Sequence, residues 1–398
     1  MKKLLILGGS NAQVPAIIQA KKLGFYTITC DYLPDNPGHA YSDLYVNIST
    51  IDYKKVLEFA EREKIDGIIA YASDPSAPSA AYVSEKMGLP GASWKSTRIF
   101  CEKDLFRKFQ KENVFLFPWF FCIQDENELD NITEKIKYPC VVKPVDLSGS
   151  KGVSTIFDYK DLKLAVKEAL LLSRCKRVII EEYIESPYCQ LHGDGVVVDG
   201  QLRFIELGDQ RFKDCVPIGS SFPSQIDPEI MEKVIETVKR HIKASGFYMG
   251  GINVEVRVGK NNEIYVIEIG PRTGGNYIPQ LMELATGFDE MTAALKLAMG
   301  EECAFFPPDN INYCFQYIVG SDQDGVFQEL YIDEYILKKV VDKYIHKRKG
   351  DYLADYKNSN GVVGVILLKF SNRIEMECDI KNIKEHIKVI VKEETDEE

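Results

Sequence analysis

Two acidic residues in neighbouring apolar strands constrain this chain more than any other feature. Valines alternate with polar residues in the stretch 253–257, which is typical of a strand. A second strand is expected at 264–269, and the turn 259–262 between them carries the small polar residues that a hairpin needs. We therefore expect an antiparallel pair in which Glu255 and Glu268 meet on the same face.

The carboxylates of Glu255 and Glu268 would repel each other unless a positive charge lay between them. Mg²⁺ is the natural occupant, because it prefers oxygen ligands. Strict alternation gives the second strand one face with Ile264, Val266 and Glu268, and another with Tyr265, Ile267 and Ile269. Glu268 is then the one acid in an otherwise apolar strand, which is costly unless the acid is paired. The alternative is a solvent-facing hairpin with ordinary surface acids.

A Gly-rich loop follows the second strand directly. Residues 270–276 read Gly-Pro-Arg-Thr-Gly-Gly-Asn. Arg272 and Asn276 would there hold an anion next to the metal.

The first 95 residues open like a nucleotide-binding βαβ unit. A strand at 3–9 runs into a Gly-rich loop, a helix follows, and a second strand at 26–30 ends in an acid. The loop lacks G-x-G-x-x-G, so a dinucleotide site is not indicated. Ligands of such sheets lie at the carboxyl ends of the strands, which makes the polar residues at those ends candidates for one crevice. These residues are Gly9, Ser10, Asn11, Asp31, Ser73 and Asp74. The alternative is that they only form turns.

A second candidate site begins at Lys143, a lysine at the end of the buried strand 138–144. Such a half-desolvated cation is costly unless it meets an anion. The loop 148–152 follows, and its glycines allow backbone N–H groups to cradle phosphate oxygens. It does not satisfy the Walker pattern, and a flexible surface loop is the alternative. The strand 177–184 ends in Glu-Glu-Tyr-Ile, whose backbone can pair with an adenine edge.

The remaining elements follow from periodicity. Helices are expected at 94–113, 159–172, 228–245 and 280–299, with Lys103 and Arg107 on one face of the first. Two strands, 189–198 and 201–208, flank the hairpin turn Asp199-Gly200. Residues 300–398 alternate strands with short helices.

Composition limits the classes of partner. The chain has 398 residues, 45% of them hydrophobic and 27% charged, which suits two or three globular domains. Its net charge of -11 argues against nucleic acid as a partner. Ten cysteines without a C-x-x-C pair indicate reduced thiols in a cytoplasm. The apolar run after Met1 is too short for a signal peptide, and no window approaches a membrane span.

The order of these pieces resembles the ATP-grasp superfamily. It runs from a helix with a lysine through strand-Lys-Pro, a Gly-rich loop and Glu-Glu-Tyr-Ile to Asn-x-Glu and Glu-x-x-Pro-Arg. The stretches 268–275 and 360–364 look most like the carboxylate–amine ligases, which are related to L-amino-acid ligases and to phosphoribosylaminoimidazole carboxylase ATPase subunits.

This resemblance implies an α/β (α+β) ATP-grasp fold in four parts. Residues 1–95 would form a Rossmann-like domain, and 96–185 the small lid subdomain with a linker helix. Residues 186–300 would form the large subdomain with the Mg-ATP site, and 301–398 a C-terminal β-rich lobe.

The resemblance also implies roles for individual residues. Lys103 and Lys143 would hold the ATP phosphates, and the loop with Ser148, Gly149, Ser150 and Gly152 would close over them. The adenine would contact Glu181, Glu182 and Ile184. Metal ligands would be Glu255 and Glu268, Arg272 would steady an acyl phosphate, and Lys213 would be a further phosphate-binding cation or an ordinary solvated lysine. Many members have Asn where this chain has Gly270, so Asn253 or Asn276 would supply the missing metal ligand.

The expected activity is an ADP-forming carboxylate–amine ligase. It would use ATP with Mg²⁺, or with Mn²⁺ in its place, and small-molecule acid and amine substrates, with Ser10, Asn11, Ser73, Asp74 and Asn276 as substrate contacts. Homodimers are common among the proteins that it resembles. Two alternatives are a carboxylase or phosphotransferase on the same scaffold, and a non-catalytic nucleotide-binding protein.

Overall fold

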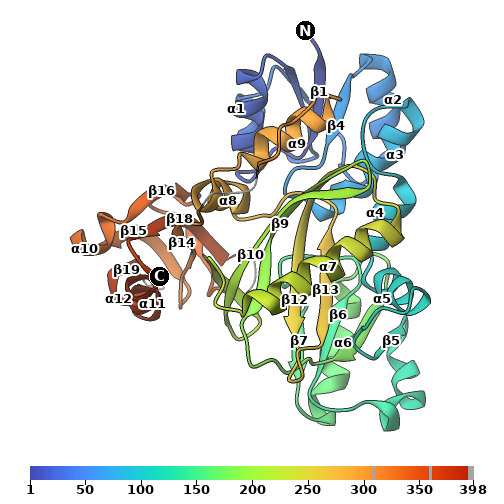
Figure 1. Cartoon of the computed structure of the whole chain (residues 1–398), viewed down its shortest axis with the longest axis vertical. Helices are drawn as coiled ribbons and strands as arrows, with labels where there is room; N and C mark the ends of the chain where they lie inside the picture. Colours follow the sequence, from blue (N-terminus) through green and yellow to red (C-terminus); the bar gives the residue numbers. More distant parts are fainter. Residues whose placement is uncertain (307–309, 358–360, 393–398) are drawn as a thin grey trace, which may run out of the picture.

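The computed structural model describes residues 1–306, 310–357 and 361–392 (Figure 1). The motif residue Asn360 lies outside the described residues. All ten cysteines are described, and all carry free thiols. Among the described helices, none has both the length and the apolar character needed to cross a membrane.

The N-terminal part is a parallel sheet of four strands in the order β3-β2-β1-β4. The strands are β1 (Lys3–Leu7), β2 (Tyr26–Cys30), β3 (Leu44–Val46) and β4 (Gly67–Ile69). Its helices are α1 (Val14–Lys22), α2 (Tyr53–Glu63) and α3 (Ala77–Met87), with short 3₁₀ turns η1 (Pro37–Ala40) and η2 (Asp74–Ser76). The carboxyl ends of β1, β2 and β4 lie at one sheet edge, as the βαβ pattern predicts.

The expected helix 94–113 is two helices, α4 (Trp94–Cys101) and α5 (Lys103–Glu112). Glu102 breaks it by adopting an extended conformation, with φ -105° and ψ 111°. Its carboxylate binds Arg98 at 2.6 Å and Arg177 at 2.5 Å. The pair with Arg177 and the hydrogen bond from the Lys103 N–H to the carbonyl of Val145 at 3.1 Å hold the chain in this turn, because both partners lie outside the helix.

The lid is a second sheet of four strands, in the order β5-β8-β6-β7. It contains β5 (Phe120–Ile123), β6 (Cys140–Pro144), β7 (Ser154–Ile156) and β8 (Val178–Glu182). Helix α6 (Tyr159–Leu172) and the 3₁₀ turns η3 (Glu126–Asn131) and η4 (Thr133–Lys135) complete it. Leu162, Val166 and Ala169 of α6 pack on this sheet to form a separate apolar core.

An antiparallel sheet of eight strands forms the centre of the molecule, in the order β13-β12-β9-β10-β11-β14-β18-β16. Its strands are β9 (Gln190–Val198), β10 (Gln201–Lys213), β11 (Val216–Phe222), β12 (Gly250–Val258), β13 (Ile264–Gly270), β14 (Tyr313–Gly320), β16 (Val340–Ile345) and β18 (Val362–Phe370). The last three belong to the stretch 301–398, so the central sheet crosses the expected boundary at residue 300. The division into four domains stays a prediction.

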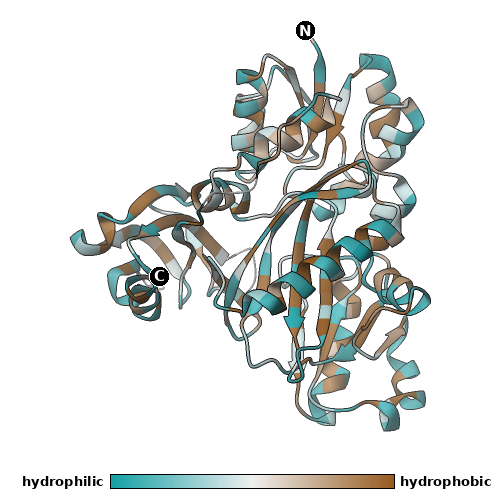
Figure 2. Ribbon diagram, viewed as in Figure 1, coloured by the Kyte–Doolittle hydropathy of each residue, from teal (hydrophilic) through white to brown (hydrophobic). Residues whose placement is uncertain are grey.

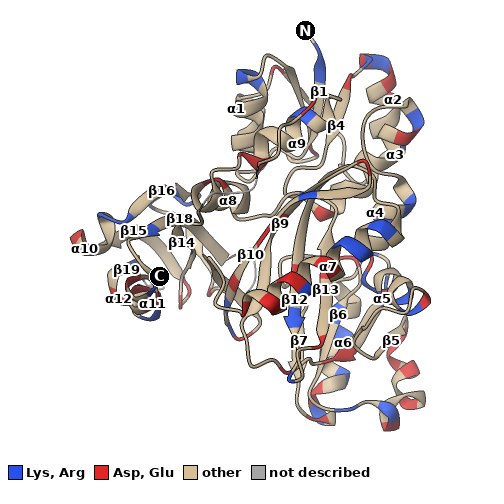
Figure 3. Cartoon of the chain, viewed as in Figure 1, with Lys and Arg blue, Asp and Glu red and all other residues tan. Residues whose placement is uncertain are grey.

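Helix α7 (Pro228–Ser245) covers one face of the central sheet (Figure 1). Asp227 caps it by accepting the N–H of Glu229 at 2.8 Å, and Gly246 ends it at a positive φ of 69°. Val234, Val238 and Ile242 face the strands. The outer surface of α7 is hydrophilic (Figure 2), with acidic residues mainly toward its start and basic residues toward its end (Figure 3).

The expected helix 280–299 is also two helices, α8 (Ile278–Thr286) and α9 (Glu290–Ala298). Gly287 ends α8 at a φ of 78°, a conformation that glycine adopts without strain. Leu295 and Met299 pack in the same apolar core as Leu4 and Ile6 of β1. This part of the chain therefore joins the N-terminal part to the central sheet.

A small sheet of three strands completes the C-terminal part, in the order β17-β15-β19. It consists of β15 (Gly325–Ile332), β17 (Tyr352–Leu353) and β19 (Ile387–Lys392), with helices α10 (Glu334–Leu337), α11 (Arg373–Lys381) and α12 (Ile383–His386).

The hairpin β12–β13 confirms the predicted pairing but corrects the predicted faces. Glu255 lies opposite Glu268, and Val256 lies opposite Val266, so Ile267 is the extra residue of a bulge. Because of the bulge, Val266 and Ile269 both face the core, while Ile267 and Glu268 face the other side.

Two side chains of α5 satisfy the carbonyl groups at this bulge. Arg107 Nη2 donates to the carbonyl of Ile267, and Gln110 Nε2 donates to that of Val266, both at 2.9 Å. Strict alternation could not foresee the change of face, because those partners lie about 160 residues away in the chain.

Candidate active site

A cleft of about 530 Å³ lies between the lid and the central sheet. The structure brings eleven of the thirteen residues expected to bind nucleotide or metal, or to act in catalysis, into this cleft. They are Lys103, Lys143, Ser148, Gly149, Ser150, Glu181, Glu182, Ile184, Glu255, Glu268 and Arg272. Val141, Val153 and Ile267 add apolar surface to its walls.

Glu255 and Glu268 form the acidic part of the cleft. Glu255 accepts a hydrogen bond from Gln190 Nε2 at 3.0 Å, and Glu268 lies 3.3 Å from Lys103 Nζ. Burial and the charge of Glu268 raise the pKa of Glu255 to about 7. The positive charge of Lys103 therefore compensates the pair only in part, and a cation would supply the missing charge.

A magnesium ion fits this donor set. Mg²⁺ is commonly bound by one or two carboxylates together with nucleotide phosphates. In the described residues, no group of three or more His, Cys, Asp or Glu side chains is arranged to hold a metal. Glu255 and Glu268 would hold the ion jointly with phosphate oxygens.

A buried ion cluster fixes Lys143 in the wall of the cleft. Glu181, on β8, binds Lys143 through one oxygen and Arg107 Nε through the other, at 3.0 Å for the latter. Burial alone would raise the pKa of Glu181, but Arg107 and Lys143 outweigh it and hold the pKa at about 2. Glu181 is thus ionised and committed to these two cations.

Sequence reasoning assigned no role to Arg107, although it is completely buried behind the cleft. A signal was present, because Arg107 follows Lys103 by one helical turn on the same face. Its guanidinium joins Glu181 of the lid to the carbonyl of Ile267 in the central sheet. It therefore connects the two walls of the cleft.

The loop 148–152 lies over the cleft beside Lys103. Lys103 Nζ donates to the carbonyl of Leu147 at 2.8 Å, which fixes the start of the loop. Gly149, Ser150 and Gly152 have positive φ angles of 67°, 58° and 71°, so the backbone turns tightly. Gly152 does not line the cleft, because it packs closely against Pro144 and Leu172. A Cβ atom on residue 152 would lie 2.9 Å from the ring of Pro144 and 2.8 Å from the side chain of Leu172.

The backbone of residues 182–184, where the chain leaves the lid for the central sheet, is held by two contacts. Glu182 N–H donates to the carbonyl of Trp119 at 2.9 Å, and the carbonyl of Ile184 accepts from Arg257 Nη1 at 3.0 Å. Both residues line the cleft next to Tyr183.

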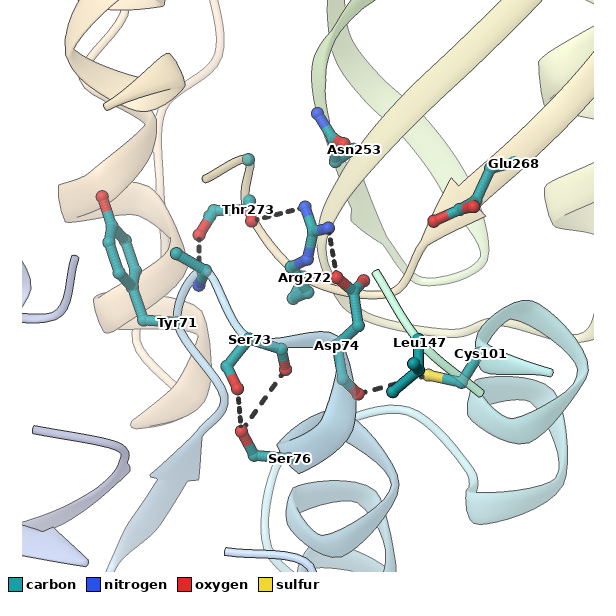
Figure 4. A network of polar contacts seen from close by, with 12 residues as sticks. Tyr71, Ser73, Asp74, Ser76, Cys101, Leu147, Asn253, Glu268, Arg272 and Thr273 are labelled. Carbon is teal, nitrogen blue, oxygen red and sulfur yellow. Dashed lines mark hydrogen bonds and ion pairs between the residues drawn. The ribbon is translucent and has the colours of Figure 1, made fainter. Parts of the chain in front are cut away.

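Arg272 is held by two partners on opposite sides (Figure 4). Its Nη2 lies 2.5 Å from Asp74 Oδ2, and its Nη1 donates to the carbonyl of Thr273 at 3.0 Å. Burial favours the neutral form of each group, but the ion pair outweighs it, so the pKa of Arg272 is raised and that of Asp74 is lowered. Arg272 is therefore charged and only 9% exposed.

Gly270 provides the space that Asp74 occupies. A Cβ atom on residue 270 would lie 3.0 Å from Asp74 Oδ1 and 3.2 Å from Arg272 Cζ. Glycine therefore allows the Asp74 carboxylate to approach β13.

The two asparagines expected to compensate for Gly270 do not line the cleft. Asn253 is buried and donates to Asp194 Oδ1 at 2.6 Å, while Gly274 N–H donates to Asp194 Oδ2 at 2.6 Å. Asp194 thus fixes the loop that carries Arg272. The sequence pattern did not identify Asp194 as a functional residue. Asn276 has a positive φ of 51°, and its carbonyl accepts from Gln316 Nε2.

The expected crevice of the N-terminal sheet does not form as one site. Ser10 Oγ donates to Gln13 Oε1 at 2.7 Å, and the Ser73 hydroxyl contacts that of Ser76. Asn11 lines a separate groove of about 690 Å³ beside His346. Gly9 N–H donates to Asp31 Oδ2 at 3.0 Å, which is a turn contact.

Asp74 is the substrate candidate that reaches the active site. It lines a chamber of about 420 Å³, which shares four wall residues with the cleft between the lid and the central sheet. These residues are Lys103, Leu147, Ser148 and Glu268. The chamber therefore adjoins the cleft at the place where the cations and acids of the cleft lie close together.

Lys213 lies at the end of β10 and does not line the cleft. Its Nζ binds Asp322 Oδ1 at 2.9 Å, and its side chain is 42% exposed. Asp322 also binds Lys384 at 2.7 Å. This placement is that of a solvated lysine in a surface ion pair.

Comparisons with known proteins agree with this geometry. Residues 136–280 match the ATP-grasp domain family. The carbamoyl phosphate synthase large chain of Thermotoga petrophila is 28% identical over 337 residues, which cover 79% of this chain and 30% of that one. The formate-dependent phosphoribosylglycinamide formyltransferase of Methanocaldococcus jannaschii is 29% identical over 286 residues, 68% of this chain and 69% of the relative.

A solved structure extends the likeness to nearly the whole chain. The L-amino acid ligase from Bacillus licheniformis superposes with a TM-score of 0.86 at 22% identity, over 98% of this chain and 99% of that one. The predicted ATP-grasp resemblance and the α/β fold class are confirmed. The chain spans about a third of the length of the carbamoyl phosphate synthase relative.

Proposed function

This chain carries an ATP-grasp domain within an ATP-grasp fold, and we propose that it is an ATP- and Mg²⁺-dependent carboxylate–amine ligase. A substrate carboxylate would attack the γ-phosphorus of ATP to give an acyl phosphate and ADP, and an amine would then displace phosphate to form an amide. The single observation that carries this proposal is the meeting of Lys103, Glu268 and Arg272 where the cleft joins a second chamber.

The residues of this chain act by charge and position. Lys143 and Lys103 bind phosphate oxygens, and the loop 148–152 closes over them and excludes water. Glu182 and Ile184 form the adenine end together with the backbone of Glu181, whose carboxylate holds Lys143. Mg²⁺, or Mn²⁺ in its place, would neutralise the phosphates while held by the carboxylate pair.

Arg272 has the role that makes the scaffold a ligase. Its buried, permanently charged guanidinium stabilises the anionic acyl phosphate and the tetrahedral intermediate. Its ion pair with the carboxylate of Asp74 supports a role in binding anionic groups. The Bacillus licheniformis protein that superposes on this chain is an L-amino acid ligase, which supports this choice of reaction.

The proposal also covers the cellular location and the partners of the enzyme. The free thiols and the net charge of -11 support a cytoplasmic protein that acts on small molecules. We expect a homodimer, and no partner among nucleic acids or membranes.

A screen for ADP release over pairs of acids and amines tests the function. ADP and phosphate should form only when ATP, Mg²⁺, an acid and an amine are all present, and an amide should be detected by mass spectrometry. Glu268→Gln should lower the rate at least about 100-fold, and chelation of the metal should abolish it. ADP release that needs bicarbonate or a hydroxyl acceptor, without an amide, would replace the ligase by a carboxylase or phosphotransferase.

A further inference from the structure

We propose that Asp74 is the residue that binds the ammonium group of the incoming amine and accepts its proton. This inference rests on the proposed ligase function. It adds to that function a binding position for the amine and a proton acceptor, both supplied by the N-terminal part of the chain.

The position of Asp74 is the first argument. Asp74 follows β4 and is the first residue of η2, so the N-terminal sheet carries it to the active site. Its Oδ2 contacts Arg272, and the charge of Lys103 and the hydroxyl of Ser148 also act on its carboxylate. The N-terminal part, the lid loop and the central sheet therefore meet at one carboxylate.

The chamber supplies the second argument. Four acids line it, and three of them are committed elsewhere. Glu102 binds Arg98 and Arg177, Asp146 binds Ser173 and the N–H of Cys175, and Glu268 belongs to the metal pair. The fourth acid, Asp74, is paired with Arg272, the guanidinium that would hold the acyl phosphate, so it is the acid of the chamber that lies beside the reacting group.

Gly270 supplies the third argument. Any larger residue would place a Cβ atom 3.0 Å from Asp74 Oδ1. A carboxylate that served only to pair with Arg272 would need Oδ2 alone. The space at residue 270 keeps Oδ1 within the site as a second acceptor.

The chemistry requires such a group. An aliphatic amine is an ammonium ion at neutral pH and is not nucleophilic until it loses a proton. Arg272 keeps Asp74 ionised, so that the carboxylate attracts the ammonium to the position where the acyl phosphate is held. Groups facing Asp74 from the elements around it are Arg272, Lys103 and Ser148, and Cys101 Sγ donates to its carbonyl at 3.6 Å.

The proposed step balances in atoms and charge. Asp74 takes one proton from the ammonium, and the nitrogen lone pair attacks the acyl carbon to form the C–N bond. The C–O bond to phosphate then breaks, phosphate leaves with the electron pair, and it takes the second proton from nitrogen. Asp74 returns its proton to solvent, so one amide, one hydrogen phosphate and one proton are produced.

Hydroxylamine provides the discriminating experiment, because it is an uncharged nucleophile at neutral pH and traps an acyl phosphate as a hydroxamate. Asp74→Asn should lower amide formation by about 100-fold or more, while hydroxamate formation should remain within about threefold of wild type. Amide formation by the variant should also recover as the pH rises toward the pKa of the free amine. Asp199→Asn, in an exposed hairpin turn, is the matched control.

Each outcome has one meaning. Equal losses with the amine and with hydroxylamine, in variants that still bind ATP, would overturn the role of Asp74, because Arg272 would then have lost its support. Asp74→Ser is the second variant if Asp74→Asn does not fold. If wild-type protein forms no hydroxamate with any acid, the ligase function fails instead. An unchanged rate of amide formation in Asp74→Asn also overturns the inference.

Discussion

Arg107 Nε lies 3.0 Å from Glu181 Oε2, and the two side chains are only 1% and 3% exposed. This ion pair joins α5 to the lid strand β8, and Lys143 occupies the second oxygen of the same carboxylate. Breaking a buried pair by removing one partner leaves a buried charge without compensation. The wall of the cleft therefore depends on an ion pair between two buried protein side chains.

Glu181→Gln should lower the free energy of unfolding by about 3–5 kcal/mol at pH 7. The folded-state pKa of Glu181, about 2, lies below the ordinary value of 4.5, so its contribution is present above pH 4.5 and is lost as the pH falls toward 2. Urea unfolding at pH 7 and pH 3 should show the difference from wild type shrinking at the lower pH. Glu185→Gln, in an exposed pair with Lys260, should cost less than about 1 kcal/mol.

Gly270→Ala should reduce acid-dependent ADP release by about tenfold, the effect of about 1.4 kcal/mol. Its Cβ atom would meet both Asp74 and Arg272, so the ion pair must shift. Steady-state kinetics with ATP and acid varied in turn would check this. Gly275→Ala is the matched control in the same loop, because a Cβ atom there has no neighbour within 4 Å. Identical losses in the two variants would argue against the crowding at residue 270.

The imidazole of His241 should make folding sensitive to mild acid. His241 is fully buried, stacks on Phe115 with ring centres 3.8 Å apart, and contacts the carbonyl of Thr237 and the amide of Gln110. Burial lowers its pKa to about 4, well below the ordinary 6.5. Below pH 6.5 the unfolded chain takes up the proton first, so this group removes up to about 3 kcal/mol of stability as the pH falls to 4.

Replacing that imidazole isolates its share of the pH dependence. His241→Gln should be less stable than wild type at pH 7, since packing is lost, but its stability should fall less between pH 6.5 and 4. Denaturant unfolding across that range measures both slopes. Parallel curves for the two proteins would show that His241 is not the group responsible.

Lys213→Ala should leave amide formation within about twofold of wild type. The variant loses only an exposed ion pair, and such pairs contribute less than about 1 kcal/mol to stability. Its ammonium binds Asp322 at the surface and does not line the nucleotide cleft. Lys143→Ala, measured in parallel by ATP titration and product formation, should weaken ATP binding strongly. A large loss of kcat in Lys213→Ala would restore the role that the family resemblance suggested for this lysine.

The hairpin that bears Glu255 and Glu268 shows where local pattern succeeds. Alternating valines and a small polar turn predicted two antiparallel strands, and the register sets the two acids opposite each other. The same reasoning assigned Ile267 and Val266 to the wrong faces, because the bulge depends on Arg107 and Gln110. The alternation of apolar and polar residues depends only on neighbours along the strand, whereas a bulge is stabilised by side chains from another element.

The helix expected at 94–113 shows the same limit of predictions from local pattern. The break at Glu102 has no glycine or proline, and the apolar period runs through it, so a single helix was predicted. An ion pair with Arg177, which directly precedes β8, stabilises the extended conformation. The backbone conformation of Glu102 therefore depends on a residue that lies 75 positions away in the chain.

The sequence by itself predicted the ATP-grasp fold class, through the order of strands, Gly-rich loops and charged residues along the chain, and it predicted most of the charged residues that line the cleft. Only the tertiary structure decided that Asp74 binds Arg272, that Arg107 supports Glu181 and that Lys213 lies outside the cleft. The physical reason is that an ion pair depends on distance and burial, and both arise from packing between segments far apart in the chain.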